Sequence, residues 1–227
     1  MKTIYCFSLV LLIGLAACQT DIDEKPAAEI VSGGSTAATS TATGEERVVP
    51  IDKSRSQIGF VGAKVTGQHE GTFHEFDGGV RFRGEEATGV DFTIGVASLE
   101  TDSQRLDNHL RSADFFDVAN HPNARFTSNS IQPVTSPSAE GHTHEVTGNL
   151  EMRGTSQEIR FPVSVAETTD GLGVVSQFTI DRHDWGVSFK GAPDDLIRDD
   201  VLIRLDIFVP NDPAAVTSDT PTNVNPG

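Results

Sequence analysis

Short runs in which apolar and polar residues alternate dominate the central part of the chain. A period of two places every second side chain on the same face, which is typical of a β-strand with one buried face. Turn residues such as Asp77-Gly78-Gly79 and Asp170-Gly171 separate the runs, as in hairpins that run up and down. The pattern predicts eight strands, whose apolar residues are Ile58 and Phe60; Val80 and Phe82; Val90, Phe92, Ile94 and Val96; Ala124 and Phe126; Val146, Leu150 and Met152; Ile159 to Val165; Val174 to Ile180; and Val201 to Val209.

The alternation does not by itself distinguish a two-layer sandwich from a closed barrel. A barrel leaves no exposed edge strands, and eight strands enclose enough space for one small ligand. We therefore expect an all-β fold, an eight-stranded antiparallel barrel. One helical pattern, around Ser103 to Arg111, is followed by the aromatic pair Phe115-Phe116 and by His121-Pro122. We expect this short helix and the residues after it to cap one end of the barrel.

The N-terminal residues 1–17 are expected to be a signal peptide, because Lys2 precedes an apolar run that is too short to remain a membrane span. The run ends in Leu15-Ala16-Ala17-Cys18, which is similar to the lipobox of bacterial lipoproteins. Cys18 would then be acylated and would hold the protein on a membrane. Gln19 after Cys18 favours the outer membrane, so the expected location is the bacterial envelope, with a lipid anchor and the domain facing the periplasm.

The remaining chain is expected to form one domain with two flexible flanks. Residues 18–46 are rich in Ala, Thr, Ser and Gly, which predicts a flexible tether after the acylated cysteine. Residues 47–210 are long enough for one hydrophobic core, and they hold no disulfide because Cys6 lies in the signal. Residues 211–227 contain three prolines and no aromatic residue, so they are expected to be a disordered tail.

Composition narrows the classes of partner. The formal net charge of −16 argues against nucleic acid as a partner of the folded domain. The chain has 13 Phe but one Tyr and one Trp. Phe adds apolar surface without a polar group to satisfy, which suits either a solid core or a cavity for a hydrocarbon.

Motifs of catalysis and metal binding are scarce. The sequence has no G-x-S-x-G, no H-E-x-x-H and no Gly-rich phosphate loop opening a helix, so we expect no enzyme and no catalytic residues. His142 and His144 have the spacing of two metal ligands on one strand face. No third ligand can be identified nearby, so we expect no metal site.

Several segments, taken together and in order, resemble a known family. They are His69-Glu70-Gly71-Thr72-Phe73, the block from His109 to Ser128, the turn from Gly148 to Gly154, and Asp181-Arg182-His183-Asp184-Trp185-Gly186. In this order they are similar to the YceI-like family, over about Val48 to Val209.

The resemblance implies a lipocalin-like barrel that binds a long isoprenoid lipid, of the quinone or polyprenyl phosphate type, in an apolar tunnel without turnover. No other cofactor is implied. For each aromatic residue ordinary core packing is the alternative, and for Arg182 between acidic neighbours a structural ion pair is the alternative. The residues expected to contact the lipid tail are Phe60, Phe82, Phe92, Phe115, Phe116, Phe126, Phe161 and Phe178. The residues expected to meet its headgroup are His69, His109, Arg111, Arg182 and His183.

A second hypothesis is a scaffold lipoprotein whose barrel is filled and whose surface docks another envelope protein. A third is an enzyme that modifies its bound lipid, which the sequence supports least because no nucleophile and base can be named. The expected partners are thus a hydrophobic lipid and the membrane, and a homodimer is the default oligomeric state.

Overall fold

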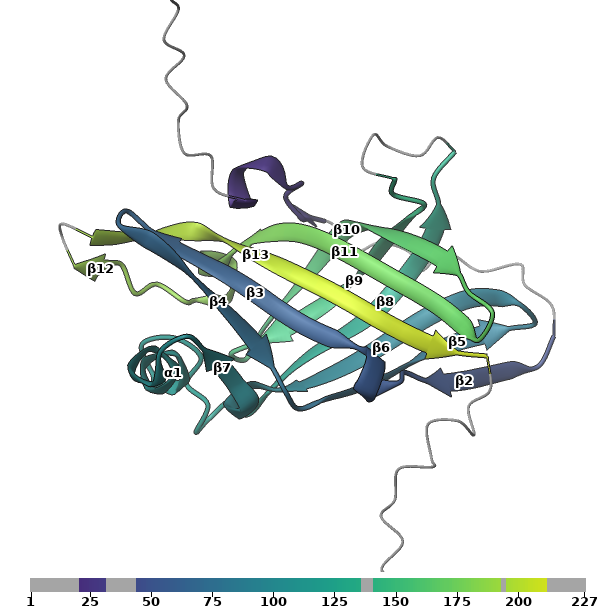
Figure 1. The fold of residues 1–227 in the computed structure, drawn as a ribbon, viewed down its shortest axis with the longest axis horizontal. Helices are drawn as coiled ribbons and strands as arrows, with labels where there is room; N and C mark the ends of the chain where they lie inside the picture. Colours follow the sequence, from purple (N-terminus) through teal and green to yellow (C-terminus); the bar gives the residue numbers. More distant parts are fainter. Residues whose placement is uncertain (1–20, 32–43, 136–140, 193–194, 212–227) are drawn as a thin grey trace, which may run out of the picture.

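A single strongly curled antiparallel sheet forms the body of the protein (Figure 1). The computed structural model describes residues 21–31, 44–135, 141–192 and 195–211. The expected signal peptide, the expected acylation site Cys18, and all of the expected C-terminal tail except Asn211 lie outside the described residues.

Thirteen strands make up this sheet in the described part of the chain, and their order is β2-β5-β6-β8-β9-β10-β11-β13-β3-β4-β7, with β1 paired to β10 and β12 paired to β13. The strands are β1 (Glu29–Ile30), β2 (Glu46–Pro50), β3 (Gln57–Lys64), β4 (Gly67–Phe73), β5 (Phe76–Arg83), β6 (Glu86–Gly95), β7 (Leu99–Thr101), β8 (Asn123–Pro133), β9 (His144–Met152), β10 (Thr155–Glu167), β11 (Gly171–Asp181), β12 (Gly191–Ala192) and β13 (Asp195–Pro210). The helices are α1 (Gln104–Arg111) and four short 3-10 segments, η1 (Asp21–Glu24), η2 (Lys53–Arg55), η3 (Val96–Ser98) and η4 (Arg182–Trp185).

The all-β antiparallel fold with one helix is confirmed, but the expected count of eight strands is wrong. The expected closure is also wrong for the described residues, because the strand order ends at β2 on one side and β7 on the other, and these two strands are not paired with each other. The sheet is therefore a strongly curled half-barrel that keeps two edge strands. The eight predicted runs correspond to β3, β5, β6, β8, β9, β10, β11 and β13. The additional strands are short or polar. β4 reads Gly-Gln-His-Glu-Gly-Thr-Phe, which has no apolar alternation, and it becomes a strand because its backbone pairs with β3 on one side and with β7 on the other.

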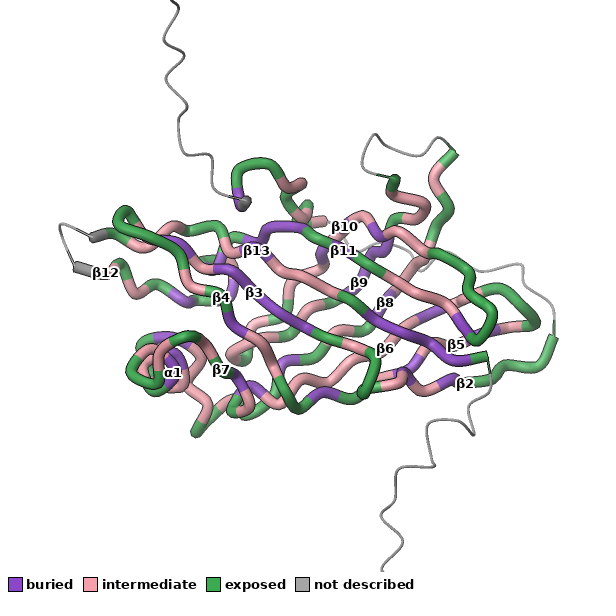
Figure 2. Tube along the Cα trace, in the orientation of Figure 1, coloured by how far each residue is buried: buried purple, intermediate pink, exposed green. Residues whose placement is uncertain are grey.

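Buried residues occur along the whole length of the curled sheet (Figure 2), and apolar side chains from most of its strands line the inside. One cluster lies near β2 and includes Val49 and Ile51. A second includes Trp185, which is 1% exposed and whose indole nitrogen donates a hydrogen bond to the carbonyl of Leu150 at 2.9 Å. A third lies under α1. The inner face is therefore predominantly apolar, as the alternation predicts.

Helix α1 covers one end of the curled sheet, at the left of Figure 1. Two polar side chains fasten it to β7. The buried carboxylate of Asp107 accepts hydrogen bonds from the amide and the hydroxyl of Thr101, at 2.8 and 2.7 Å. The guanidinium of Arg111 donates to the carbonyls of Ala97 and Leu99. The expected helical cap is confirmed, and Leu110 and Phe115 point from it into the apolar cluster.

Part of the segment predicted to be a flexible tether is folded against the sheet. Within residues 18–46, residues 21–31 form η1 and β1, and β1 pairs with β10. Ile22 is 3% exposed and packs against Val61 and Leu202 on the outer face of the sheet. The composition of this segment gave no sign of folding, because one isoleucine and a few backbone hydrogen bonds are enough to attach it.

Candidate functional site

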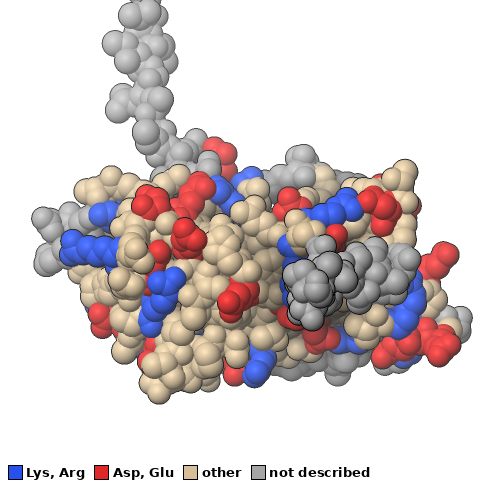
Figure 3. Space-filling model, turned by 60° about the horizontal axis from the view of Figure 1, so that its bottom comes forward, with Lys and Arg blue, Asp and Glu red and all other residues tan. Residues whose placement is uncertain are grey.

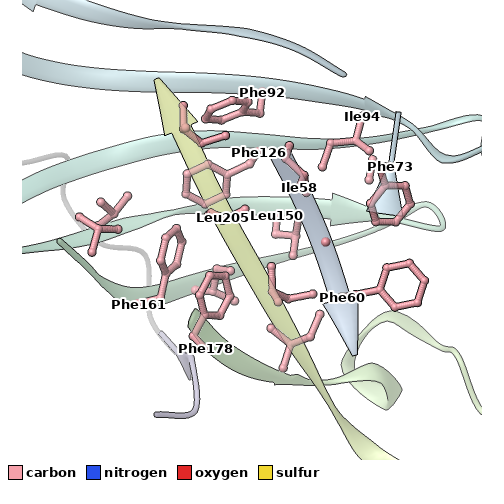
Figure 4. Close-up of a pocket in the computed structure, with 18 of the residues that line it drawn as sticks. Ile58, Phe60, Phe73, Phe92, Ile94, Phe126, Leu150, Phe161, Phe178 and Leu205 are labelled. Carbon is pink, nitrogen blue, oxygen red and sulfur yellow. The ribbon is translucent and has the colours of Figure 1, made fainter. Parts of the chain in front are cut away.

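The curled sheet encloses a cavity of about 870 Å³ whose lining is dominated by aliphatic and aromatic side chains (Figure 4). Most of the strands contribute to this lining, and Leu106 and Leu110 of α1 contribute at one end. Ligand-binding pockets commonly measure about 300–1,000 Å³. The interior is thus large enough for a ligand and does not match the filled interior expected of a scaffold.

All eight phenylalanines predicted to contact a lipid tail line this cavity. Phe115 and Phe116 come from the cap after α1, and the other six come from strands. The six strand residues share this position because each lies at one of the alternate, apolar positions of its strand, whose side chains all point to the same face of the sheet. The rings are Phe60 of β3, Phe82 of β5, Phe92 of β6, Phe126 of β8, Phe161 of β10 and Phe178 of β11. Their contact with a lipid stays a prediction.

Glycines on neighbouring strands keep these rings against the wall. Phe60 of β3 lies opposite Gly71 of β4, and a Cβ placed on that glycine would come within 2.3 Å of the ring. The ring of Phe126 is similarly close to Gly148 of β9, which lies diagonal to it in the register, and a Cβ placed on that glycine would come within 2.6 Å of the ring. Because the ring occupies the space that a neighbouring side chain would fill, it lies along the sheet, and the centre of the curl stays open.

Aromatic contacts connect the rings around the cavity. Phe161 and Phe178 are stacked, with ring centroids 4.3 Å apart and an interplanar angle of 16°. Phe73 links Phe60 to Phe116, with centroid distances of 5.4 and 6.4 Å. Sequence reasoning missed Phe73 as a cavity residue because it ends the polar strand β4, where no alternation identifies an inner face.

The aromatic pair of the cap has two different environments. Phe115 is buried, with the ring of His109 against it edge-on at 4.9 Å and the ring of Phe189 behind it at 5.3 Å. Phe116 is half-buried and faces Phe73 across the cavity. Phe115 therefore holds the cap together, whereas Phe116 is the member of the pair that leaves more surface for a ligand.

The five residues predicted to meet a headgroup are not brought together. His69 and Arg182 line the cavity, whereas the other three do not. His109 pairs with Asp114 at 3.1 Å, and the imidazole of His183 lies 3.2 Å from the carboxylate of Asp181. Arg111 binds backbone carbonyls, as described above. Histidine and arginine serve as structural donors as readily as ligand donors, and the sequence does not separate the two uses.

Arg182 is a structural residue by its contacts. Its side chain is 5% exposed and donates to the carbonyls of Arg198 and Val187, at 3.0 and 2.6 Å, and to the carboxylate of Asp199 at 3.1 Å. These bonds join η4 to β13. The guanidinium thus stabilises the fold, in agreement with the structural ion pair that the sequence analysis gave as the alternative to a headgroup contact.

Ionisable side chains lie toward both ends of the cavity lining. Lys64 and His69 lie at the end covered by α1, and His69 is 2.8 Å from Asp102. The carboxylates of Glu85, Glu86 and Glu167 lie at the opposite end, near the hairpins that follow β5 and β10, and His144 at the start of β9 also lines the cavity away from α1. On the outer surface the two signs are mixed, as on the face seen in Figure 3.

Among the residues that the structure describes, two side chains have shifted pKa values, and neither lines the cavity. The hydrogen bond from Arg55, with a further one from Thr168, lowers the pKa of Asp170 below its ordinary value of 3.8. The hydrogen bond to Asp23 raises the pKa of Arg198. Both shifts arise from ion pairs between elements of the fold, and neither side chain is placed for proton transfer in the cavity.

The described ranges show few features of other kinds of site. No cluster of three or more His, Cys, Asp or Glu residues there is suited to a metal ion, and His144 has its imidazole 2.9 Å from the hydroxyl of Thr143. None of the helices described is both long and apolar enough to cross a bilayer.

Known proteins resemble the chain in sequence and in fold. A UPF0312 protein of Pectobacterium carotovorum is 35% identical over 131 residues, which cover 54% of this chain and 65% of that protein, so the chain matches just under two thirds of this relative's length. The crystal structure of Burkholderia cenocepacia BcnA superposes with a TM-score of 0.62 at 24% identity, covering 70% of this chain and 99% of that one. A polyisoprenoid binding domain from Saccharophagus degradans, implicated in plant cell wall breakdown, gives 0.56 at 18%, covering 72% and 99%.

The similarity to these two structures shows a shared fold. The family is shown by a match to a family model. The model of the YceI-like domain matches residues 50–209, which include β3 to β13 and every residue of the cavity lining. The chain therefore belongs to the YceI-like family.

Proposed function

We propose that the protein binds a long isoprenoid lipid in the cavity and carries or sequesters it without chemical turnover. The observation that supports this most directly is the apolar cavity of about 870 Å³ with nine phenylalanines in its wall. A structural neighbour described as a polyisoprenoid binding domain has the same fold, which is consistent with the proposal. A carrier of this kind needs shape and apolar surface, and it needs no nucleophile or base.

The energetics favour a chain-like hydrocarbon. Each 100 Å² of apolar surface removed from water contributes about 2.5 kcal/mol. A polyprenyl tail offers no hydrogen bonds, so it leaves no buried polar group unsatisfied. Binding is then limited by the fit of the tail and by the cost of ordering it, and several tails of similar length would be accepted.

The headgroup and the location complete the proposal. The lipid is of the quinone or polyprenyl phosphate type, and an anionic headgroup would fit better beside Lys64 and His69 than beside Glu86 and Glu167 at the other end. Acylation at Cys18 would hold the protein in the bacterial envelope, facing the periplasm at the outer membrane. The lipobox-like residues before Cys18 support this location.

The test is direct binding of two defined lipids. The purified full-length chain is mixed with ubiquinone-10 or undecaprenyl phosphate, and native mass spectrometry and the melting temperature are recorded. One bound lipid and a raised melting temperature are expected, because a ligand that binds only the folded state stabilises it. Absence of both effects with both lipids, and no extractable lipid in protein purified from its host, would contradict the proposal.

A matched pair of variants links binding to the cavity. Ile94 lines the cavity on β6, and its neighbour Thr93 does not. Ile94→Trp should fill part of the space and weaken binding, whereas Thr93→Trp should leave it unchanged. Equal effects of the two substitutions would place the lipid outside the cavity.

A further inference from the structure

The wall of the cavity has a seam between β10 and β11. These strands are paired only from Ser164–Glu167 to Leu172–Val175. Farther along, β10 stays paired with β9 as far as Thr155, and β11 stays paired with β13 as far as Asp181. Beyond this short paired stretch, β10 and β11 separate, although each stays paired with its other neighbour.

The N-terminal segment of residues 26–31 fills this seam as a shared strand. On the β11 side, the amide of Ala28 donates to the carbonyl of Thr179 at 2.7 Å, and the amide of Thr179 donates to the carbonyl of Pro26 at 2.9 Å. On the β10 side, the amide of Val31 donates to the carbonyl of Glu158 at 2.8 Å. The segment thus satisfies backbone groups of both strand edges that would otherwise face solvent.

Only a thin layer of side chains lies between this segment and the cavity. Ala28 packs against the cluster that contains Phe161 and Phe178. These two stacked rings come from the opposite sides of the seam, and both line the cavity. In Figure 4 they lie beside the purple N-terminal segment. The wall here consists of one short strand outside and one ring pair inside.

The segment is fastened more weakly than the strands around it. Its register with β10 has two residue pairs, Glu29 with Arg160 and Ile30 with Ile159, whereas the register of β11 with β13 runs without a break from Gly171 to Asp181. Its ion pairs, Glu29 with Arg160 and Asp23 with Arg198, lie at the surface, where such pairs add little. Few hydrogen bonds and little buried apolar surface mark the part of a wall that opens first.

We propose that the seam between β10 and β11 is a lateral portal for the lipid, and that residues 21–31 are the displaceable strand that closes it. The inference rests on the proposed function and adds the route of entry and exit. Lifting the segment and parting Phe161 from Phe178 opens the middle of the cavity along its length. A long tail then enters sideways and does not have to thread past the cap formed by α1.

The test is a reversible crosslink of the segment to the wall. Glu29 and Arg160 are opposite each other in the antiparallel register, and neither side chain lines the cavity. Opposed residues in such pairs are about 5.5 Å apart or less between Cα atoms, which suits a disulfide. The full-length chain carries E29C and R160C, with Cys6→Ser and Cys18→Ser so that no other thiol competes. A matched control carries T127C and N149C, which are opposite each other on strands β8 and β9, whose pairing extends on both sides of a bulge at Asn129.

Each protein is loaded with ubiquinone-10 and mixed with phosphatidylcholine vesicles, and the rate of quinone transfer is measured before and after reduction. Oxidation should slow transfer at least tenfold in the seam variant, reduction should restore it, and the control should not respond. Equal rates in the oxidised and reduced seam variant would overturn the portal and assign transfer to the ends of the cavity. If neither the wild type nor any variant binds quinone, the proposed function is wrong, and the portal proposal, which rests on it, is wrong as well.

A second variant needs no crosslink. Asp23→Lys places a positive charge against Arg198 and should loosen the segment, so transfer should become several-fold faster with little change in the main melting transition. An unchanged or slower transfer rate would contradict the role of the segment.

Discussion

Phe60 lies across Gly71 of the adjacent strand so closely that a methyl group at position 71 would come within 2.3 Å of the ring. The glycine therefore shapes the cavity, although it is not among the residues that line it. Where the ring lies determines how much of the interior is open.

Gly71→Ala should push the ring of Phe60 into the cavity, lower the affinity for ubiquinone-10 and cost about 1–3 kcal/mol of stability through overpacking. Titration of the quinone and denaturant unfolding measure the two effects. Gly67→Ala on the same strand is the control, because no atom lies within 4 Å of the Cβ it would add and the residue does not line the cavity. A Gly71 variant that binds like the Gly67 variant would show that the ring position does not limit the cavity.

The two rings of the cap should respond differently to truncation. Phe115→Ala removes a buried ring that contacts His109 and Phe189, and we expect a loss of about 3–5 kcal/mol in unfolding free energy. Phe116→Ala removes a half-buried ring at the cavity, so lipid should leave faster with a smaller loss of stability. Chemical denaturation and the vesicle transfer assay compare them. The reverse ranking would make Phe116 the architectural member of the pair.

Arg182 should matter for folding more than for lipid recognition. Arg182→Met leaves the carbonyls of Val187 and Arg198 without their donor, and the expected loss is about 3 kcal/mol. Arg182→Lys should recover only part of it, because an ammonium lacks the planar fork. Normal stability with lost binding of undecaprenyl phosphate would instead support a headgroup role.

The pair of Asp170 and Arg55 should make stability depend on pH in the acidic range. The pKa of Asp170 is lower in the folded protein than its ordinary value of 3.8, so the unfolded state binds the proton more readily. The contribution is present above that value and is lost as the pH falls through the folded pKa. Melting temperatures of the wild type and of Asp170→Asn should therefore differ at pH 7 and converge at low pH. A constant difference would exclude the carboxylate charge as its cause.

The alternation of apolar and polar residues predicts those strands that form because one of their faces is buried. The eight apolar runs became β3, β5, β6, β8, β9, β10, β11 and β13, since one face of each is buried. It does not predict β4 or β1, whose formation depends on backbone pairing with residues far away in the chain. Ile22 shows the limit well, because its burial depends on Val61 and Leu202 and not on its own neighbours in sequence.

The same limit applies to the site. The parity of the strands places the six predicted strand phenylalanines at the cavity, but the register that sets Gly71 opposite Phe60 cannot be read from either strand alone. The roles of polar residues are harder to predict from the sequence than those of the phenylalanines. Arg111 and Arg182 looked suited to a headgroup, and carbonyls on other elements already accept their hydrogen bonds.

The one tryptophan of the chain, Trp185, is buried in the cluster that contains Phe161 and Phe178, and the one tyrosine, Tyr5, falls in the expected signal peptide. The fold thus carries a single intrinsic fluorophore next to the cavity wall. A quinone bound inside would quench its emission, so filling and emptying can be followed optically in the unmodified protein.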